Sequence, residues 1–420
     1  MASPAPHPSR PGRARRASRR ARVRRGILSL HRWIGLTAGV LLAVAGLTGG
    51  TLVFREEIDV ALNPQLRRVA PPPGQEPGAR PRVASLQAAL DAVARAYPTE
   101  PATRVRMPRD ASGTYEVWLG SAPSRYVYVN PYTARVLGAR RPTEFLTGWL
   151  FQLHAHALAG ERGGRVVGVN GLALAALTLT GLVIWWPGRR RLRSALVVRS
   201  GAGPARVVYD LHRAAGFYAS AVLLVAALTG ASLVFHEAAE RIANALTGTS
   251  RPPEATGTMA PAEGRARATP AVVTPRLSAD VLIARAVQRQ PGGTISYVYL
   301  PAPLGAGTFR VRQRLPGEMH PNGRSTVTLD AQTGRALRVE DGRQLPRGSR
   351  LYAALYPIHT GAWGGWPTRA LAVAIGALPA LLAVTGALVW WRRGRRAPAF
   401  GSRRRWTSLR RWRAAETAAK

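Results

Sequence analysis

The chain has 420 residues and a formal net charge of +39, from 60 Lys and Arg against 21 Asp and Glu. It contains no Cys, which excludes disulfides, iron–sulfur clusters and thiolate ligation of haem. A charge of this size would suit nucleic acid, but its placement along the chain suits a membrane better, so we expect no nucleic-acid partner.

The first 25 residues are mostly Arg, Pro, Ala and Ser. They offer almost no large apolar side chain for burial, and we predict that residues 1–25 form a disordered basic tail. An Arg-rich start before an apolar run also resembles a signal peptide. The run is too long for one and returns later in the chain, so we expect no cleavage.

Four uninterrupted apolar stretches follow, each of 21 or 22 residues and without a charged residue: Ile34–Phe54, Val166–Trp186, Ala214–Phe235 and Ala370–Trp391. At 1.5 Å per residue each is roughly 31–33 Å long, about the thickness of a bilayer's hydrocarbon core. Buried helices of a soluble protein are the alternative, but they explain four such stretches poorly. We therefore predict transmembrane helices at 26–54, 166–187, 211–236 and 369–391.

Basic residues are concentrated in the short segments between and beyond these helices. Met1–Trp33, Pro187–Arg213 and Arg392–Lys420 together hold 28 basic and two acidic residues, whereas the two long segments hold 32 and 19. Short Arg-rich segments stay on the cytoplasmic side of a membrane. We predict a multi-pass protein of the bacterial inner membrane with both termini, the loop 188–210 and the basic tail 392–420 in the cytoplasm.

Both long segments predict a small extracytoplasmic α+β domain, at 55–143 and 237–347. In each, a helical stretch precedes an alternating strand, a turn and a second strand. The helical stretches are Ser85–Tyr97 and Ser278–Gln290, and the hairpins are Arg125–Gly138 and Ser325–Arg338. An amphipathic, His-bearing segment, at 144–165 and again at 348–368, leads into the next transmembrane helix.

The sequence contains an internal duplication. LHRWIGLTAGVLLAVAGLTGGTLVF (Leu30–Phe54) aligns without a gap with LHRAAGFYASAVLLVAALTGASLVF (Leu211–Phe235), and TGLVIWW (Thr180–Trp186) matches TGALVWW (Thr385–Trp391). The predicted fold is a mainly α membrane protein with four transmembrane helices in a duplicated two-helix unit. An axis along the membrane normal would relate the halves.

Four histidines occupy repeated positions, His31 with His212 and His154 with His359. Symmetry would bring the members of each pair face to face, and two opposed neutral imidazoles are what a six-coordinate haem iron needs. We therefore predict two haems, both of the non-covalent b type because there is no Cys. Nearby arginines are expected to bind the haem propionates; they are Arg32, Arg213, Arg165 and Arg369.

Other readings of these histidines stay open. A His-Arg-Trp sequence at a membrane boundary is also a common interfacial anchor. His154, His156 and His359 could instead ligate zinc or copper. His236 and His156 are second-rank candidates for the outer haem ligand; His236 aligns with Arg55 in the other half.

Taken together and in their chain order, the motifs LHRWIGL, LTGGTLVF, YVYVNPYTARVLG, TGLVIWW and VTLDAQTGRAL resemble the PepSY-associated transmembrane family over nearly all of residues 26–396. The resemblance implies PepSY-like outer domains. It also implies a relation to inner-membrane ferric-siderophore reductases that hold two b-type haems, with His31, His154, His212 and His359 as axial ligands.

The expected function is therefore transmembrane electron transfer, that of a membrane oxidoreductase which reduces an extracytoplasmic ferric siderophore or other ferric chelate during iron uptake. The sequence has no flavin or nicotinamide motif, so we expect a separate cytoplasmic reductase or quinol as electron donor. The alternative is a non-enzymatic membrane protein whose outer domains bind a peptide, protease or sensor partner. A metal or siderophore permease ranks third, because the spans carry no acidic residue.

Overall fold

We analysed a computed structural model that describes residues 11–72, 84–120, 125–249, 277–301 and 307–395. The chain divides into two compact units, each described here by itself. The first consists of residues 1–43, 173–224 and 378–420, and the second of 44–172 and 225–377. Each long apolar helix contributes one part to each unit.

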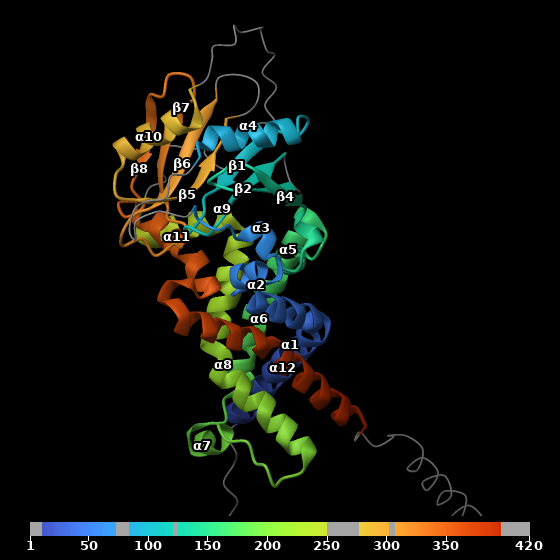
Figure 1. Cartoon of the computed structure of the whole chain (residues 1–420). Coiled ribbons are helices and arrows are strands. Elements are labelled where there is room, and N and C mark those ends of the chain that lie inside the picture. The colour runs from blue at the N-terminus through green and yellow to red at the C-terminus, as the bar shows by residue number, and fades with distance from the viewer. Residues whose placement is uncertain (1–10, 73–83, 121–124, 250–276, 302–306, 396–420) are drawn as a thin grey trace, which may run out of the picture. The chain divides into compact units, whose positions relative to one another are not determined.

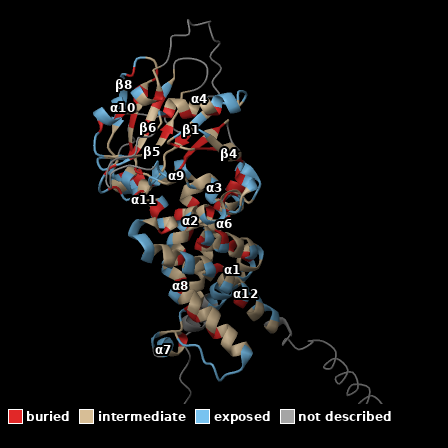
Figure 2. Cartoon of the chain, in the orientation of Figure 1, coloured by how far each residue is buried: buried red, intermediate tan, exposed pale blue. Residues whose placement is uncertain are grey.

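Four helices of the described chain are long and apolar enough to cross a membrane, as predicted (Figure 1). They are α1 (Pro11–Leu52), α6 (Gly160–Trp185), α8 (Pro204–Val234) and α12 (Gly365–Arg395). Large apolar side chains on them, such as Val40 and Val384, are more than half exposed. Figure 2 shows mostly intermediate and exposed residues along these helices. Surfaces of this kind are stable in contact with lipid.

The helices extend beyond the apolar stretches that predicted them. α1 begins at Pro11 and not near residue 26, so the expectation of a disordered tail is wrong for residues 11–25, while 1–10 lie outside the described residues. Arg and Ala have high helix propensities, and Pro is tolerated in a first helical turn. α6 and α12 likewise start several residues before the predicted boundaries at 166 and 369.

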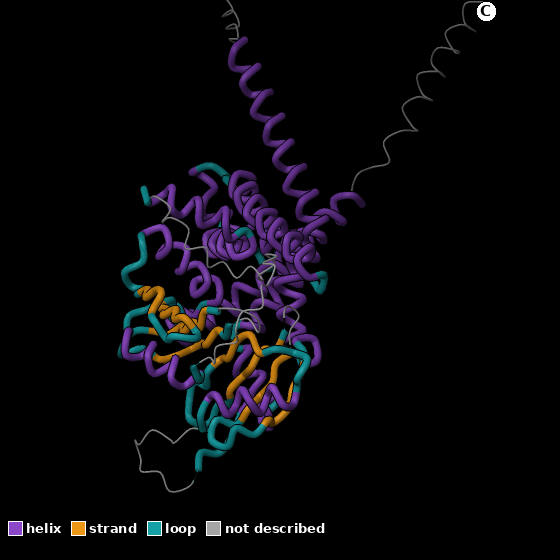
Figure 3. Tube along the Cα trace, turned by 90° about the horizontal axis from the view of Figure 1, so that it is seen from above, coloured by secondary structure: helices purple, strands orange, loops and turns teal. Residues whose placement is uncertain are grey.

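In the second unit, the eight strands of the described chain form a single antiparallel sheet, ordered β4-β3-β2-β1-β5-β6-β7-β8. Figure 3 draws the strands in orange. The strands are β1 (Ala102–Arg106), β2 (Tyr115–Leu119), β3 (Arg125–Val129), β4 (Val136–Arg140), β5 (Thr294–Tyr299), β6 (Thr308–Arg314), β7 (Ser325–Asp330) and β8 (Ala336–Glu340). Strands β1 and β5 join the two halves, with Val105 opposite Val298. The prediction of two separate small domains therefore needs correction, because each half supplies four strands to one sheet.

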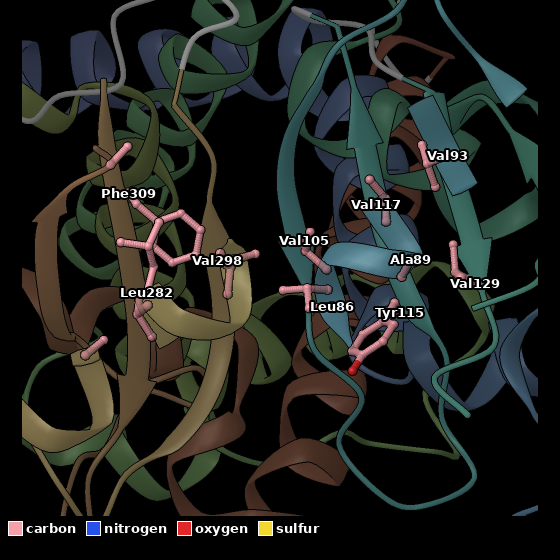
Figure 4. Packing of buried hydrophobic residues seen from close by; sticks show 14 of the residues in the cluster. Leu86, Ala89, Val93, Val105, Tyr115, Val117, Val129, Leu282, Val298 and Phe309 are labelled. Carbon is pink, nitrogen blue, oxygen red and sulfur yellow. The ribbon is translucent and has the colours of Figure 1, made fainter. Parts of the chain in front are cut away.

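One face of this sheet is covered by α4 (Leu86–Ala96) and α10 (Ala279–Arg289). Their buried side chains, including Leu86, Val93 and Leu282, form one hydrophobic core with Val105 and Val298 from the central strands (Figure 4). Because the core includes residues from both halves, neither half buries its apolar face alone.

The N-termini of α4 and α10 cap each other. The carboxylate of Asp280 accepts hydrogen bonds from the Leu86 backbone N–H (2.8 Å) and the Ser85 hydroxyl (2.7 Å). In return, the side-chain oxygen of Gln87 accepts from the Ala279 N–H at 3.0 Å. The capping groups thus satisfy donors that each helix leaves free at its start.

The opposite face of the first half-sheet packs against α2 (Arg55–Leu62) and α3 (Pro64–Arg67) through ion pairs. Glu56 bonds Arg67 (2.7 Å) and Arg106 (2.8 Å), and Arg67 also bonds Glu116 (2.7 Å). Burial alone would raise the pKa of Glu56, but the charges of Arg106 and Arg67, with the Arg106 hydrogen bond, lower it to about 2. The carboxylate is therefore held in its charged form.

Shorter helices complete the described chain. The predicted His-bearing segments become α5 (Leu146–His156) and α11 (Arg347–Thr360), and α9 (His236–Thr247) packs against α11. The remaining elements are α7 (Leu192–Ala195) and the 3-10 turns η1 (Pro142–Glu144), η2 (Arg189–Arg191) and η3 (Ala362–Gly364).

Candidate functional site: two histidine pairs

The first histidine pair lies within the first unit. His31 on α1 and His212 on α8 have ring centres 6.4 Å apart, with ring planes at 80°. Each ring also contacts a further helix: His31 Nδ1 is 3.0 Å from Thr180 Oγ1 on α6, and His212 Nδ1 is 3.0 Å from Thr385 Oγ1 on α12. Residues distant in sequence are thus brought together in the pairing that the repeat predicts.

The second pair lies within the second unit. His154 on α5 and His359 on α11 have ring centres 6.2 Å apart and ring planes at 38°. His154 Nδ1 lies 2.9 Å from the carbonyl oxygen of Ala45 and 3.3 Å from Thr48 Oγ1, both on α1. His359 Nδ1 lies 3.1 Å from Thr229 Oγ1 on α8. The contacts repeat those of the first pair.

A glycine follows each of these threonines, and its missing side chain leaves the space that the imidazole fills. A Cβ placed on the glycine would approach the histidine Cε1 to 2.7 Å at Gly49, 2.9 Å at Gly230, 3.1 Å at Gly386 and 3.3 Å at Gly181. Distances below 3.0 Å are shorter than carbon atoms tolerate, so the rings of His154 and His359 require glycine at these positions.

The electrostatics of the second pair favour neutral imidazoles. Burial lowers the pKa of His154 on α5 and of His359 on α11 below the usual value for histidine. The nearby His154 lowers the pKa of His359 further, to about 4. Neutral rings have an unprotonated nitrogen, and that nitrogen is the atom that binds a metal.

The second-rank candidates lie outside both pairs. The His156 ring contacts Phe151, with ring centres 6.0 Å apart, and His236 is exposed and accepts a hydrogen bond from the Glu237 backbone N–H. Within the described ranges, no three His, Cys, Asp or Glu side chains gather in a group that could hold a metal ion.

Three of the four arginines expected near the histidines have carboxylate partners. Arg213 pairs with Asp210 (3.2 Å), Arg369 with Glu57 (2.6 Å), and Arg165 with Glu161 (2.6 Å). Arg165 is largely exposed, whereas Arg213 and Arg369 are mostly buried. Arg32 is exposed, and its guanidinium lies 5.3 Å from the ring centre of Trp33.

Sequence reasoning missed the threonines and glycines that hold the imidazoles. A signal was present, because each of the four spans contains one Thr-Gly dipeptide, at Thr48, Thr180, Thr229 and Thr385. Small residues in membrane helices are usually explained by close helix packing, and the same dipeptide also occurs in loops. The dipeptides could be assigned to histidines only once the structure brought them together.

Comparison with known proteins gave a family match. The family model of the PepSY-associated TM region matches residues 28–393, which include most of the first span, the other three spans, both histidine pairs and the described sheet. No curated protein gave a match. A match over most of the chain, together with four helices suited to crossing a bilayer, identifies the chain as a membrane protein that belongs to the PepSY-associated transmembrane family.

Proposed function

We propose that the chain holds two b-type haems, one between His31 and His212 and one between His154 and His359, and conducts electrons through the membrane. The spacing of the rings carries the proposal. With nitrogen–metal bonds of about 2.0 Å and about 1.1 Å from nitrogen to ring centre, two imidazoles that together held one iron would have ring centres up to about 6.2 Å apart. The observed separations are 6.4 and 6.2 Å.

The character of the donors supports haem over a bare metal ion. Each site offers two imidazoles, whereas structural zinc sites take four protein ligands and catalytic ones three. A planar macrocycle supplies the remaining four donors itself, and when bound it would provide one-electron transfer. The chain's contribution is to ligate the iron, fix the spacing and exclude water. The assignment of Arg32, Arg165, Arg213 and Arg369 to propionates stays a prediction.

The charge distribution supports an orientation of the chain, and from it we propose a direction of electron flow. The Arg-rich termini and the loop 188–210 favour a cytoplasmic position, which would leave the sheet outside the inner membrane. We propose a cytoplasmic reductase or quinol as donor and an anionic ferric chelate, such as a ferric siderophore, as acceptor. Excess Arg in both long segments, 15 basic to 10 acidic and 17 to 9, would attract such an anion.

One observation favours the alternative, a protein that binds a partner and transfers no electrons. A groove with a volume of about 590 Å³ opens between α4 and α10, lined by apolar side chains that include Leu90, Leu282 and Leu300. Such a groove could accept an apolar peptide segment. This alternative requires no cofactor, so haem content separates the two functions.

The test is the absorbance spectrum and haem content of the purified protein. We expect two haems per chain with six-coordinate, low-spin spectra. His31→Ala or His212→Ala should remove one haem, and His154→Ala or His359→Ala the other. His156→Ala and His236→Ala are matched controls and should keep both. A Soret band that survives replacement of all four paired histidines would refute the assignment, and a haem-free wild type would favour the binding function.

A further inference from the structure

The two histidine pairs share one supporting contact, made four times. Each ring nitrogen Nδ1 lies 3.0–3.3 Å from the hydroxyl of a threonine on another helix. The pairings are His31 with Thr180, His154 with Thr48, His212 with Thr385 and His359 with Thr229. No other threonine hydroxyl forms a hydrogen bond with a histidine in the described part of the chain.

The proton of each of these hydroxyls is already donated to a hydrogen bond within its own helix. Each threonine also back-bonds to the carbonyl oxygen four residues earlier in its own helix: Thr180 to Ala176 at 2.6 Å, Thr48 to Val44, Thr229 to Val225 and Thr385 to Leu381 at 2.7 Å. A hydroxyl has one proton and two lone pairs. Towards the histidine, the oxygen can therefore only accept.

It follows that Nδ1 carries the proton in all four rings. His154 gives independent support, because its Nδ1 also faces the Ala45 carbonyl oxygen at 2.9 Å, and a carbonyl can only accept. A neutral imidazole protonated at Nδ1 has its free lone pair on Nε2. The threonines, joined at His154 by the nearer Ala45 carbonyl oxygen, thus favour the tautomer whose Nε2 can bind a metal.

We infer that Thr48, Thr180, Thr229 and Thr385 are positioning residues that hold the four imidazoles as Nε2 donors and tune their donor strength. The inference rests on the proposed haem function. An Nδ1–H hydrogen bond makes the imidazole a stronger base, which favours the oxidised iron and keeps the reduction potential low. Each threonine is followed by the glycine that makes room for the same ring. Each Thr-Gly dipeptide therefore supplies both the hydrogen-bond acceptor and the space for one imidazole.

The test is a redox titration that follows one haem alone. In a His154→Ala background only the haem between His31 and His212 should remain. Thr180→Val removes the hydroxyl but keeps the side-chain shape, and Thr180→Ser restores the hydroxyl. Thr178→Val on the same helix is the matched control, because among the described residues the Thr178 hydroxyl bonds only to its own helix, at Leu174.

We expect Thr180→Val to raise the reduction midpoint, with up to about a tenfold change in the oxidation–reduction equilibrium, and to alter the low-spin EPR signal. Thr180→Ser should restore both, and Thr178→Val should change neither. Haem loss in Thr180→Val that Thr180→Ser reverses would also support the role of the hydroxyl.

An unchanged midpoint and EPR signal in Thr180→Val would overturn the inference, as would equal defects in Thr180→Val and Thr180→Ser, since those would indicate packing. Both results leave the haem proposal intact. Absence of haem from the wild-type protein would instead remove the proposed function itself.

Discussion

Individual glycines decide whether an imidazole fits beside its helix. Alanine normally stabilises a helix by about 1 kcal/mol relative to glycine. At Gly49 the added Cβ would approach His154 Cε1 to 2.7 Å, and overpacking of this kind costs about 1–3 kcal/mol. The clash should therefore outweigh the gain in helix propensity, and the ring should move from its place.

We predict that Gly49→Ala and Gly230→Ala lose most of the haem bound by His154 and His359. Gly181→Ala and Gly386→Ala, where the contact distances are 3.3 and 3.1 Å, should have milder effects on the other pair. Gly216→Ala is the control, because its Cβ would meet Leu382 at an ordinary 3.7 Å. Haem-to-protein ratios and melting temperatures measure the outcome. Full haem retention in Gly49→Ala would show that the ring is not held as described.

At this scale, the sequence predicted the four paired histidines because the repeat fixed their equivalence. It did not predict their support. In the sequence, Thr48 and Gly49 look the same as small residues that only allow close helix packing. Nothing in their chemistry shows that they contact a histidine ring. Their role depends on which helix packs beside them, and that is a tertiary property.

At the scale of elements, the helices α4 and α10 and the hairpins β3–β4 and β7–β8 were predicted from periodicity and turn residues. Ser85 and Ser278 even mark the observed N-caps. The pairing of β1 with β5 was not predicted. Strand alternation reveals which face of a strand is apolar, but not which edge another strand will occupy. For this reason the sequence predicted two separate domains, whereas the structure has one sheet with strands from both.

The ion pairs between α2 and the sheet should make stability depend on pH. The pKa of Glu56 is lowered to about 2 in the folded protein, against about 4.3 in an unfolded chain. Its stabilisation is therefore complete above pH 4.5 and is lost as the pH falls towards 2. The contribution is at most roughly 3 kcal/mol.

We predict that Glu56→Gln melts at a lower temperature than the wild type at pH 7, and that the difference shrinks as the pH is lowered from 4.5 to 2. The exposed Glu237 on α9 provides the control, and Glu237→Gln should melt like the wild type throughout. A difference between Glu56→Gln and wild type that stays constant with pH would contradict this account of the ion pairs.

For the whole molecule, length and hydropathy were enough to predict four membrane helices, and the order of motifs was enough to predict the family. The identities of the proposed electron donor and acceptor do not follow from length, hydropathy or motif order. They depend on molecules that meet the protein in the membrane and on either side of it. Within residues 26–396, the excess of Arg indicates only that the proposed acceptor should be anionic.

Electron flow through the whole chain is the last prediction. Each predicted span is about as long as the bilayer core is thick, and the proposed function gives an electron two haem sites in crossing it. Conduction should then need both pairs. In vesicles with a reductant inside and a ferric chelate with a ferrous trap outside, the wild type should produce ferrous iron.

Variants separate the contributions of the two sites. His31→Ala and His359→Ala should each abolish ferrous iron production, although each keeps one haem. His236→Ala, the exposed control, should behave like the wild type. Activity that needs only one pair would contradict a path through both sites. Wild-type protein that carries two haems but reduces none of several ferric chelates would exclude the iron role and leave transmembrane conduction to be tested with other acceptors.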